Sequence, residues 1–184
     1  MRWQQLFADL EAQFDEAAAI ELAAEVRDRT RRELAAVRLV DRLRPAVGQL
    51  LAIRVLGTGA VNGQLTAVGA DWLLLAEVGG RETLLPVHAV LAISGLGAQS
   101  ATPHTEGPVA AKLGFGYALR GIARDRSAVT LDLVDGSTLA GTLDRVGADF
   151  AELAEHPAGE PRRRDSVRGV RTVPWPAIAL VRKT

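Results

Sequence analysis

The stretch Val68-Gly69-Ala70-Asp71-Trp72 decides the fold because it occurs twice, returning as Val146-Gly147-Ala148-Asp149-Phe150. Residues 50–77 around the first copy align with residues 128–155 around the second at a constant offset of 78, without a gap. The chain is therefore a duplication. Each repeat is small for a protein domain, because units of about 50–70 residues bury little surface on their own.

The apolar residues inside each repeat have a period of two. Leu51, Ile53 and Val55 alternate with other residues, which predicts a β-strand. Gly63 lies inside the second expected strand and indicates a bulge or a sharp bend. Five short runs separated by tight turns in residues 50–94 predict a small antiparallel β-barrel. The residues that we expect in the two cores are Leu51, Ile53, Val55, Leu65, Val68, Trp72, Leu75, Val129, Leu131, Leu133, Leu143, Val146, Phe150 and Leu153.

The N-terminal segment has a different period. Residues 2–44 contain neither Gly nor Pro, and strong helix formers dominate them. The apolar residues at helical spacing are Trp3, Leu6, Phe7, Leu10 and Phe14 and, further along, Leu34, Val37, Val40 and Leu43. This pattern predicts one long helix, or two joined near Asp15, that ends at Arg44-Pro45. Acidic residues precede basic ones, which indicates a solvated helix face or antiparallel pairing of the acidic half with the basic half.

We therefore predict an α+β protein with an N-terminal helical segment followed by two tandem five-stranded antiparallel small β-barrels. The expected domains are an N-terminal helix or helical hairpin (1–45), a first small barrel (46–96), a linker (97–108) and a helix plus the second small barrel (109–184). The linker assignment rests on its content of Gly, Ser, Thr, Pro and His.

The bulk composition excludes several classes of protein. Lys and Arg number 22, as do Asp and Glu, so the net charge is zero and no global basic field would steer the chain to nucleic acid. There is no cysteine, which excludes disulfides and thiolate metal sites and fits a reducing cytoplasm. No apolar run approaches the roughly 18 residues of a membrane helix, and the N-terminus lacks the pattern of a signal peptide. We expect a cytoplasmic protein with no membrane partner.

The two repeats differ by a ten-residue insertion that forms a loop from His156 to Val170. The basic residues in or beside this loop are Arg162, Arg163, Arg164, Arg168 and Arg171. A cluster of arginines neutralises several phosphates without a basic global field, and guanidinium groups stack on bases. The alternatives are a solvated insertion without a ligand and an acidic protein surface as the ligand.

No catalytic set is visible in the sequence. His88, His104 and His156 do not pair at metal-ligand spacing, and Ile93-Ser94-Gly95 lacks the frame of a nucleophile elbow. The glycines at 114, 116 and 121 do not form a dinucleotide-binding motif. We therefore predict no enzyme, no cofactor and no metal site.

The segment from Val129 to Phe150 resembles the first signature of Sm-like proteins, including the bacterial Hfq type. The match includes the turn Asp135-Gly136, the mid-strand Gly141 and Asp149 at the next turn. Residues 173–181 look like the second signature, although Trp175-Pro176 stand where that family has a basic pair. The resemblance covers most of residues 109–182 and, more faintly, 34–94. SH3-like barrels, such as the C-terminal domain of ribosome maturation factors, carry a similar pattern.

The resemblance implies a short helix followed by a strongly bent five-stranded barrel, and it implies RNA binding. Asp71 and Asp149 match the aspartate that helps to form the nucleotide-binding loop of Sm-like proteins, and Trp175 lies at the second signature. The alternative is that each carboxylate accepts hydrogen bonds from the backbone of its own turn.

These observations predict a non-catalytic binding protein that contacts RNA or another nucleic acid through the arginine loop. The alternative is a protein-interaction adapter or scaffold in which residues 2–44 dock a partner or a second copy. Sm-like proteins form rings by pairing edge strands, but here the tandem copies could pair with each other, and Pro174 and Pro176 discourage addition of a strand. We therefore expect a monomer or a homodimer.

Overall fold

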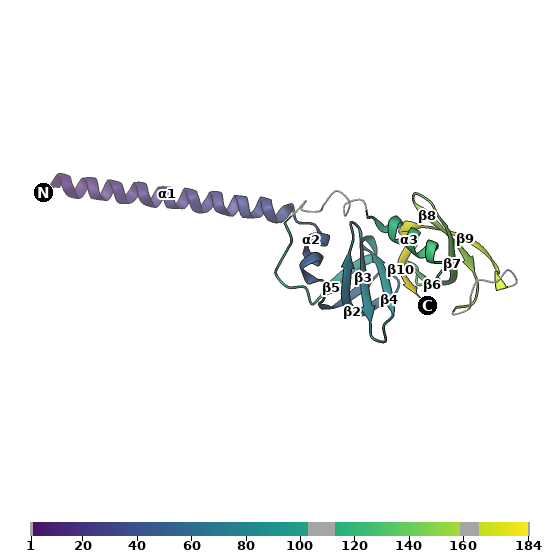
Figure 1. Ribbon diagram of the computed structural model, residues 1–184. Coiled ribbons are helices and arrows are strands. Elements are labelled where there is room, and N and C mark those ends of the chain that lie inside the picture. The colour runs from purple at the N-terminus through teal and green to yellow at the C-terminus, as the bar shows by residue number, and fades with distance from the viewer. Residues whose placement is uncertain (1, 103–112, 159–165, 184) are drawn as a thin grey trace. The chain divides into compact units, whose positions relative to one another are not determined.

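A computed structural model describes residues 2–102, 113–158 and 166–183 (Figure 1). The chain divides into two compact units, Met1–Arg38 and Leu39–Thr184. The helices are α1 (Arg2–Ala35), α2 (Leu39–Leu43) and α3 (Phe115–Asp125), with short 3-10 turns at Arg44–Ala46, Val87–Ala89 and Trp175–Ala177. The strands are β1 (Leu50–Val55), β2 (Gly59–Val68), β3 (Trp72–Glu77), β4 (Glu82–Pro86), β5 (Val90–Ser94), β6 (Ala128–Leu133), β7 (Thr138–Val146), β8 (Phe150–Glu155), β9 (Gly169–Pro174) and β10 (Ile178–Lys183).

The first unit is the single helix α1, which runs without a break through Asp15. It ends at Ala35, nine residues before the expected stop, and 3-10 hydrogen bonds close its last turn at Ala36 and Val37. The expectation of one stripe continuing to Leu43 is therefore wrong, because α2 is a separate helix whose Val40 and Leu43 are buried in the second unit. The side chains of Leu6 and Leu10 lie outside the described part of the chain.

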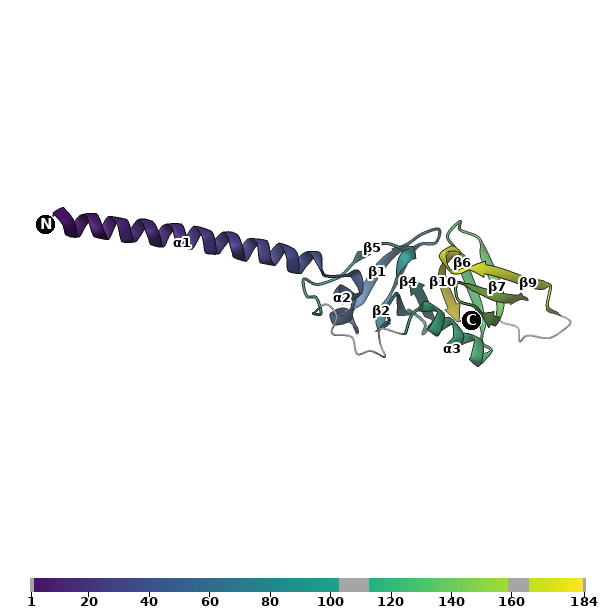
Figure 2. The same ribbon diagram turned by 90° about the horizontal axis from the view of Figure 1, so that it is seen from above.

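The strands of the second unit form one open antiparallel sheet. Within the described residues it has ten strands in the order β5-β1-β2-β3-β4-β10-β6-β7-β8-β9. Figure 2 shows β10 between β4 and β6, where the two repeats meet. The α+β mixture of helices and sheet is as expected.

The prediction of two closed barrels is wrong. A closed barrel would need a ladder from β4 to β5 and another from β9 to β10, and the described strands form neither. The free edge of β4 is instead occupied by β10 of the other repeat, where Val181 lies opposite Leu84 and Arg182 opposite Thr83. The hydrogen-bonding groups that would close the first barrel are thus used to join the repeats, as expected for tandem copies that pair with each other.

The strand registers show the duplication directly. Leu51 lies opposite Gly63 in β1 and β2, and Val129 lies opposite Gly141 in β6 and β7, at the offset of 78. The register shift after Leu65 in the first repeat recurs after Leu143 in the second. The expected irregularity in the second strand of each repeat is therefore present, with a bulge shortly after the glycine.

The two hydrophobic cores share residues across the junction. Ala179 and Leu180 of β10 belong to the core of the first repeat. Leu84 of β4 belongs to the core of the second repeat. Of the residues expected in the cores, the fully buried ones are Leu51, Ile53, Val55, Leu65, Leu75, Val129, Leu131, Leu143 and Leu153, and the half-buried ones are Val68, Trp72, Leu133, Val146 and Phe150.

The repeated turn has the same geometry in both copies. The N–H of Gly69 donates to the carbonyl of Trp72 and the N–H of Gly147 to that of Phe150, both at 2.8 Å. A Cβ on Gly69 would lie 2.2 Å from the Trp72 ring, so the aromatic side chain folds back onto the glycine. The expectation that both rings fill their own cores is wrong, because Trp72 packs against the core of the second repeat.

Candidate ligand-binding site at the seam between the repeats

Arg182 is the central polar residue of the seam where β4 meets β10. Its Nε lies 3.2 Å from an Oε1 of Glu77 at the end of β3, and its guanidinium also pairs with Asp132 of β6. Thr83 donates a hydrogen bond to Glu77, and Thr138 donates one to Asp132 at 3.1 Å. The side chains of Arg182, Glu77 and Asp132 retain only 20%, 20% and 12% of their exposure. One arginine therefore ties together carboxylates from the two repeats.

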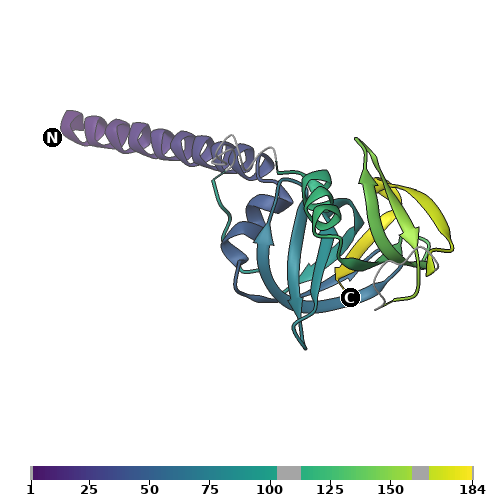
Figure 3. The same cartoon turned by 45° about the vertical axis from the view of Figure 1, so that its right-hand side comes forward.

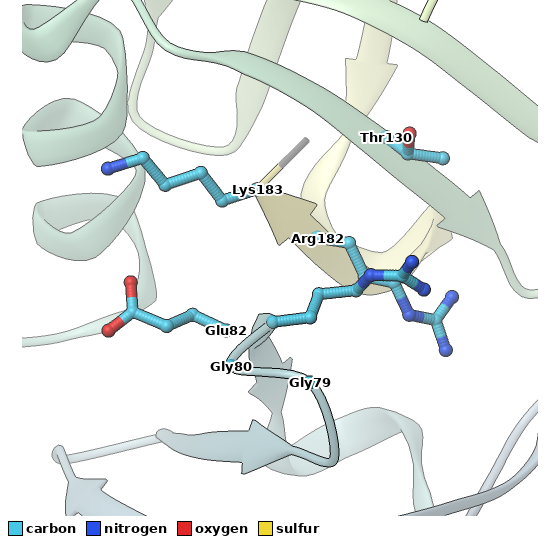
Figure 4. Close-up of a pocket in the computed structure, with 7 residues that line it drawn as sticks. Gly79, Gly80, Glu82, Thr130, Arg182 and Lys183 are labelled. Carbon is cyan, nitrogen blue, oxygen red and sulfur yellow. The ribbon is translucent and has the colours of Figure 1, made fainter. Parts of the chain in front are cut away.

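A pocket of about 630 Å³ opens beside this network. Its lining includes the turn Gly79-Gly80, Arg81, Glu82, Thr130, Arg182 and Lys183. Figure 4 shows the side chains of Glu82 and Lys183 extending to one side of the pocket and that of Arg182 to the other. The charges of Arg81, Arg182 and Lys183 are balanced by those of Glu77, Glu82 and Asp132, so the pocket suits a polar or zwitterionic group better than a multiply charged anion.

A second, mainly apolar cavity shares Glu82 and Lys183 with this pocket. This cavity, which we call the slot, has a volume of about 200 Å³. Its lining residues are Trp72, Leu74, Leu84, Ala118, Ile122, Val181, Glu82, Asp125, Ser127 and Lys183. Figure 3 shows α3, drawn in green, beside the strands of the first repeat, drawn in teal. The slot therefore has one wall from each repeat.

The turn residue Asp71 holds α3 in this place. Its carboxylate accepts a hydrogen bond of 2.6 Å from the N–H of Phe115, the first residue of α3. The indole N–H of Trp72 donates to the carbonyl of Leu113 at 2.7 Å. Asp71 thus caps a helix of the other repeat, and the interpretation that it only forms its own turn is wrong for this copy. We expected a helix over residues 109–123. The structure describes this segment from residue 113 onward, and the helix begins at Phe115.

Asp149, the counterpart of Asp71, is exposed, and its backbone carbonyl accepts a hydrogen bond of 2.8 Å from the N–H of Trp175. The Trp175 ring lies edge-on to Phe115 with centroids 6.2 Å apart. Its buried indole N–H has no hydrogen-bond partner among the described residues. Asp71 therefore caps α3, Asp149 forms part of a turn, and Trp175 packs against Phe115 of α3.

The arginines expected to bind nucleic acid are described only in part. Arg162, Arg163 and Arg164 lie outside the described residues. Arg168 is exposed, and its backbone N–H donates to the carbonyl of Glu155 at 2.8 Å. Arg171 is exposed and forms an ion pair of 2.9 Å with Glu155. Arg168 and Arg171 thus lie at the start of β9, apart from the residues that line the seam.

The exposed aromatic residues of α1 are a second candidate surface. Trp3, Phe7 and Phe14 are 72%, 59% and 74% exposed. At about 100° per residue they lie within about 40° of one another around the helix axis. We call these three side chains the aromatic face of α1. Contiguous exposed apolar surface is a feature of many sites of protein association.

Histidines and acidic residues do not converge in the described part of the chain. His88 lies against the carbonyl of Ile178 at 3.2 Å, and His156 is buried with its Nε2 2.8 Å from the Thr142 hydroxyl. No group of three His, Asp or Glu residues in residues 2–102, 113–158 and 166–183 could hold a metal ion. Of the helices that are described, none is both long and apolar enough to cross a membrane.

Sequence reasoning missed the seam residues. The only available signal was divergence between the repeats, because Arg182 and Lys183 stand in the second copy where the first has Ser94 and Gly95. A charged pair at that position indicates a role that the other copy does not have. Its partners, Glu77 and Asp132, carried no signal of their own.

Comparison with known proteins adds no assignment. No protein-family model matches the chain, and a search of curated protein sequences gives no significant match.

Proposed function

We propose that this protein is a non-catalytic, cytoplasmic adapter that docks onto a partner protein through the aromatic face of α1. The observation that carries the proposal is the exposure of Trp3, Phe7 and Phe14 on one side of a helix. Aromatic side chains bury large areas and dominate the energetics of protein interfaces. A helix that inserts a few large apolar side chains into a groove is a recurrent mode of recognition that uses such anchors.

The charge around the aromatic face specifies the chemistry of the partner. Residues 2–25 contain six acidic residues and one basic residue, which gives this part of α1 a net charge of −5. A groove bordered by Lys and Arg is complementary to this charge, and such complementarity raises the rate of association and rejects acidic surfaces. We therefore expect an apolar groove with a basic border.

The test compares two triple variants of the full-length protein. In the first, Trp3, Phe7 and Phe14 become Ala, which removes the aromatic face and keeps a strong helix former. In the matched control, Ile20, Leu22 and Val26 become Ala; these side chains are also exposed but lie on other sides of α1. In-cell cross-linking and light scattering then measure association.

The proposal expects a defined cross-linked species that the aromatic variant loses and the control variant keeps. Equal behaviour of the two variants, or no associated species with the wild-type protein, rejects the proposal.

Nucleic-acid binding remains a second candidate function, because Arg168 and Arg171 are exposed beside the arginine loop. Neutralising several phosphates would give binding that weakens steeply with salt. A fluorescence titration with labelled RNA at low salt tests this function. Binding that is absent, or unchanged when Arg162, Arg163 and Arg164 become Ala, rejects it.

A further inference from the structure

The slot has the composition of a small-molecule site. Trp72, Leu74 and Leu84 from the first repeat face Ala118 and Ile122 of α3 across a volume of about 200 Å³. Ligand pockets are mainly apolar with a few polar groups that fix orientation. An apolar protein cavity of about 150 Å³ accommodates a benzene ring, so the slot is large enough for a phenyl or isobutyl group.

The charged residues that line the slot, at its mouth, are Glu82, Asp125 and Lys183. All three residues are exposed, and none of their side chains forms a hydrogen bond or ion pair with another residue that the structure describes. The mouth thus offers two carboxylates and one ammonium group, each with its hydrogen-bonding capacity unused. In Figure 4 the side chains of Glu82 and Lys183 extend to the same side of the neighbouring pocket.

We propose that the slot binds a free α-amino acid with an apolar side chain of the size of phenylalanine or leucine. The side chain fills the slot between α3 and the first repeat. The α-ammonium group donates hydrogen bonds to Asp125 and Glu82, and the α-carboxylate accepts one from Lys183. The charged end of the ligand stays at the exposed mouth, where it keeps part of its hydration and loses little free energy on binding.

This arrangement requires both charges of the ligand and its apolar group. The N-terminal residue of a peptide would present the ammonium group without the carboxylate, and a C-terminal residue would present the reverse. A hydrophobic molecule without charge would leave all three mouth residues unpaired. The location between the repeats also means that the ligand contacts both, so it should stabilise the folded protein against heat.

The experiment is a titration of the full-length protein with L-phenylalanine, followed by NMR of the methyl and indole signals of the slot and by thermal unfolding. Phenylalaninamide, N-acetylphenylalanine and alanine serve as comparison ligands. We expect saturable shifts with phenylalanine, a raised Tm, and binding at least about tenfold weaker for each comparison ligand, since each lost charged hydrogen bond or apolar group costs about that factor.

Variants locate the site. Asp125→Asn and Lys183→Gln change exposed residues, so both proteins should fold, and each should weaken binding about tenfold. Ala118→Leu fills the slot and should abolish binding. Asp149→Asn, a change of an exposed aspartate away from the slot, should leave binding unchanged. Absence of shifts with phenylalanine, equal binding of either blocked derivative, or full binding by Asp125→Asn and Lys183→Gln overturns the proposal.

Discussion

Replacing Arg182 by Met tests whether the seam network holds the repeats together. The change keeps most of the side-chain volume but removes the cation, which leaves Glu77 and Asp132 facing each other at the seam. Removing one partner of a buried ion pair costs about 3–5 kcal/mol. Because the three side chains keep 12–20% of their exposure, water relieves part of this cost, and we expect a loss of about 2–3 kcal/mol. At about 2–4 °C per kcal/mol, the Tm should fall by about 4–12 °C.

The assay is urea unfolding followed by circular dichroism, with Arg171→Met as the matched control. Arg171 pairs with Glu155, the counterpart of Glu77 at the offset of 78, but its side chain is 63% exposed. An exposed pair of this kind contributes about 0–1 kcal/mol. Combining Arg182→Met with Glu77→Gln and Asp132→Asn should restore most of the loss, because no charge is then left unpaired. Equal losses for the two methionine variants, or no recovery in the triple variant, would refute the reasoning.

Three further changes probe the repeats. Asp71→Ala removes the cap of α3 and should cost about 1 kcal/mol in urea unfolding, whereas Asp149→Ala should change stability by less than about 0.5 kcal/mol; equal effects would contradict the capping role. Gly141→Ala places a Cβ 2.1 Å from a backbone oxygen and should cost about 1–3 kcal/mol; an unchanged urea midpoint would contradict this close approach. The hydroxyl of Ser137 and, to a smaller extent, its N–H donate hydrogen bonds to Asp135 and hold the pKa of this carboxyl below 3.8. These hydrogen bonds make a small contribution to the stability of the fold above pH 3.8, and this contribution is lost as the pH falls through the lowered pKa. Ser137→Ala should raise that pKa toward 3.8 in a carboxyl ¹³C NMR titration, and an unchanged value would contradict the cause.

The local features of the fold could be predicted from the sequence. Alternation of apolar residues located the strands, and the constant offset located the duplication, because both depend on neighbouring residues in the chain. The glycine at 63, and its counterpart at 141, indicates a strand irregularity for the same reason. Each of these patterns reflects contacts within one repeat, where the sequence distance between partners is short.

The sequence allowed the tandem copies to pair with each other, but the details of the contacts between the repeats could not be predicted. The free edge of β4 has the same hydrogen-bonding groups whether it meets β5 or β10, so the sequence does not distinguish a closed barrel from an open sheet. Arg182 lies 105 residues from Glu77 and 50 from Asp132, and Asp71 lies 44 residues from the helix that it caps. The sequence where α1 ends, at Ala35, contains no Gly or Pro. We attribute this end to the burial of Val40 and Leu43 further along the chain.

The place of β10 in both cores has a consequence for synthesis on the ribosome. The first repeat obtains Ala179 and Leu180 from β10, which the ribosome makes after every other strand of the two repeats. Residues 46–96 therefore cannot complete their core while they are the only repeat that has emerged, although all five of their own strands are present. We expect the two repeats to reach the native state together, in one step that follows the emergence of residues 178–183 from the ribosome.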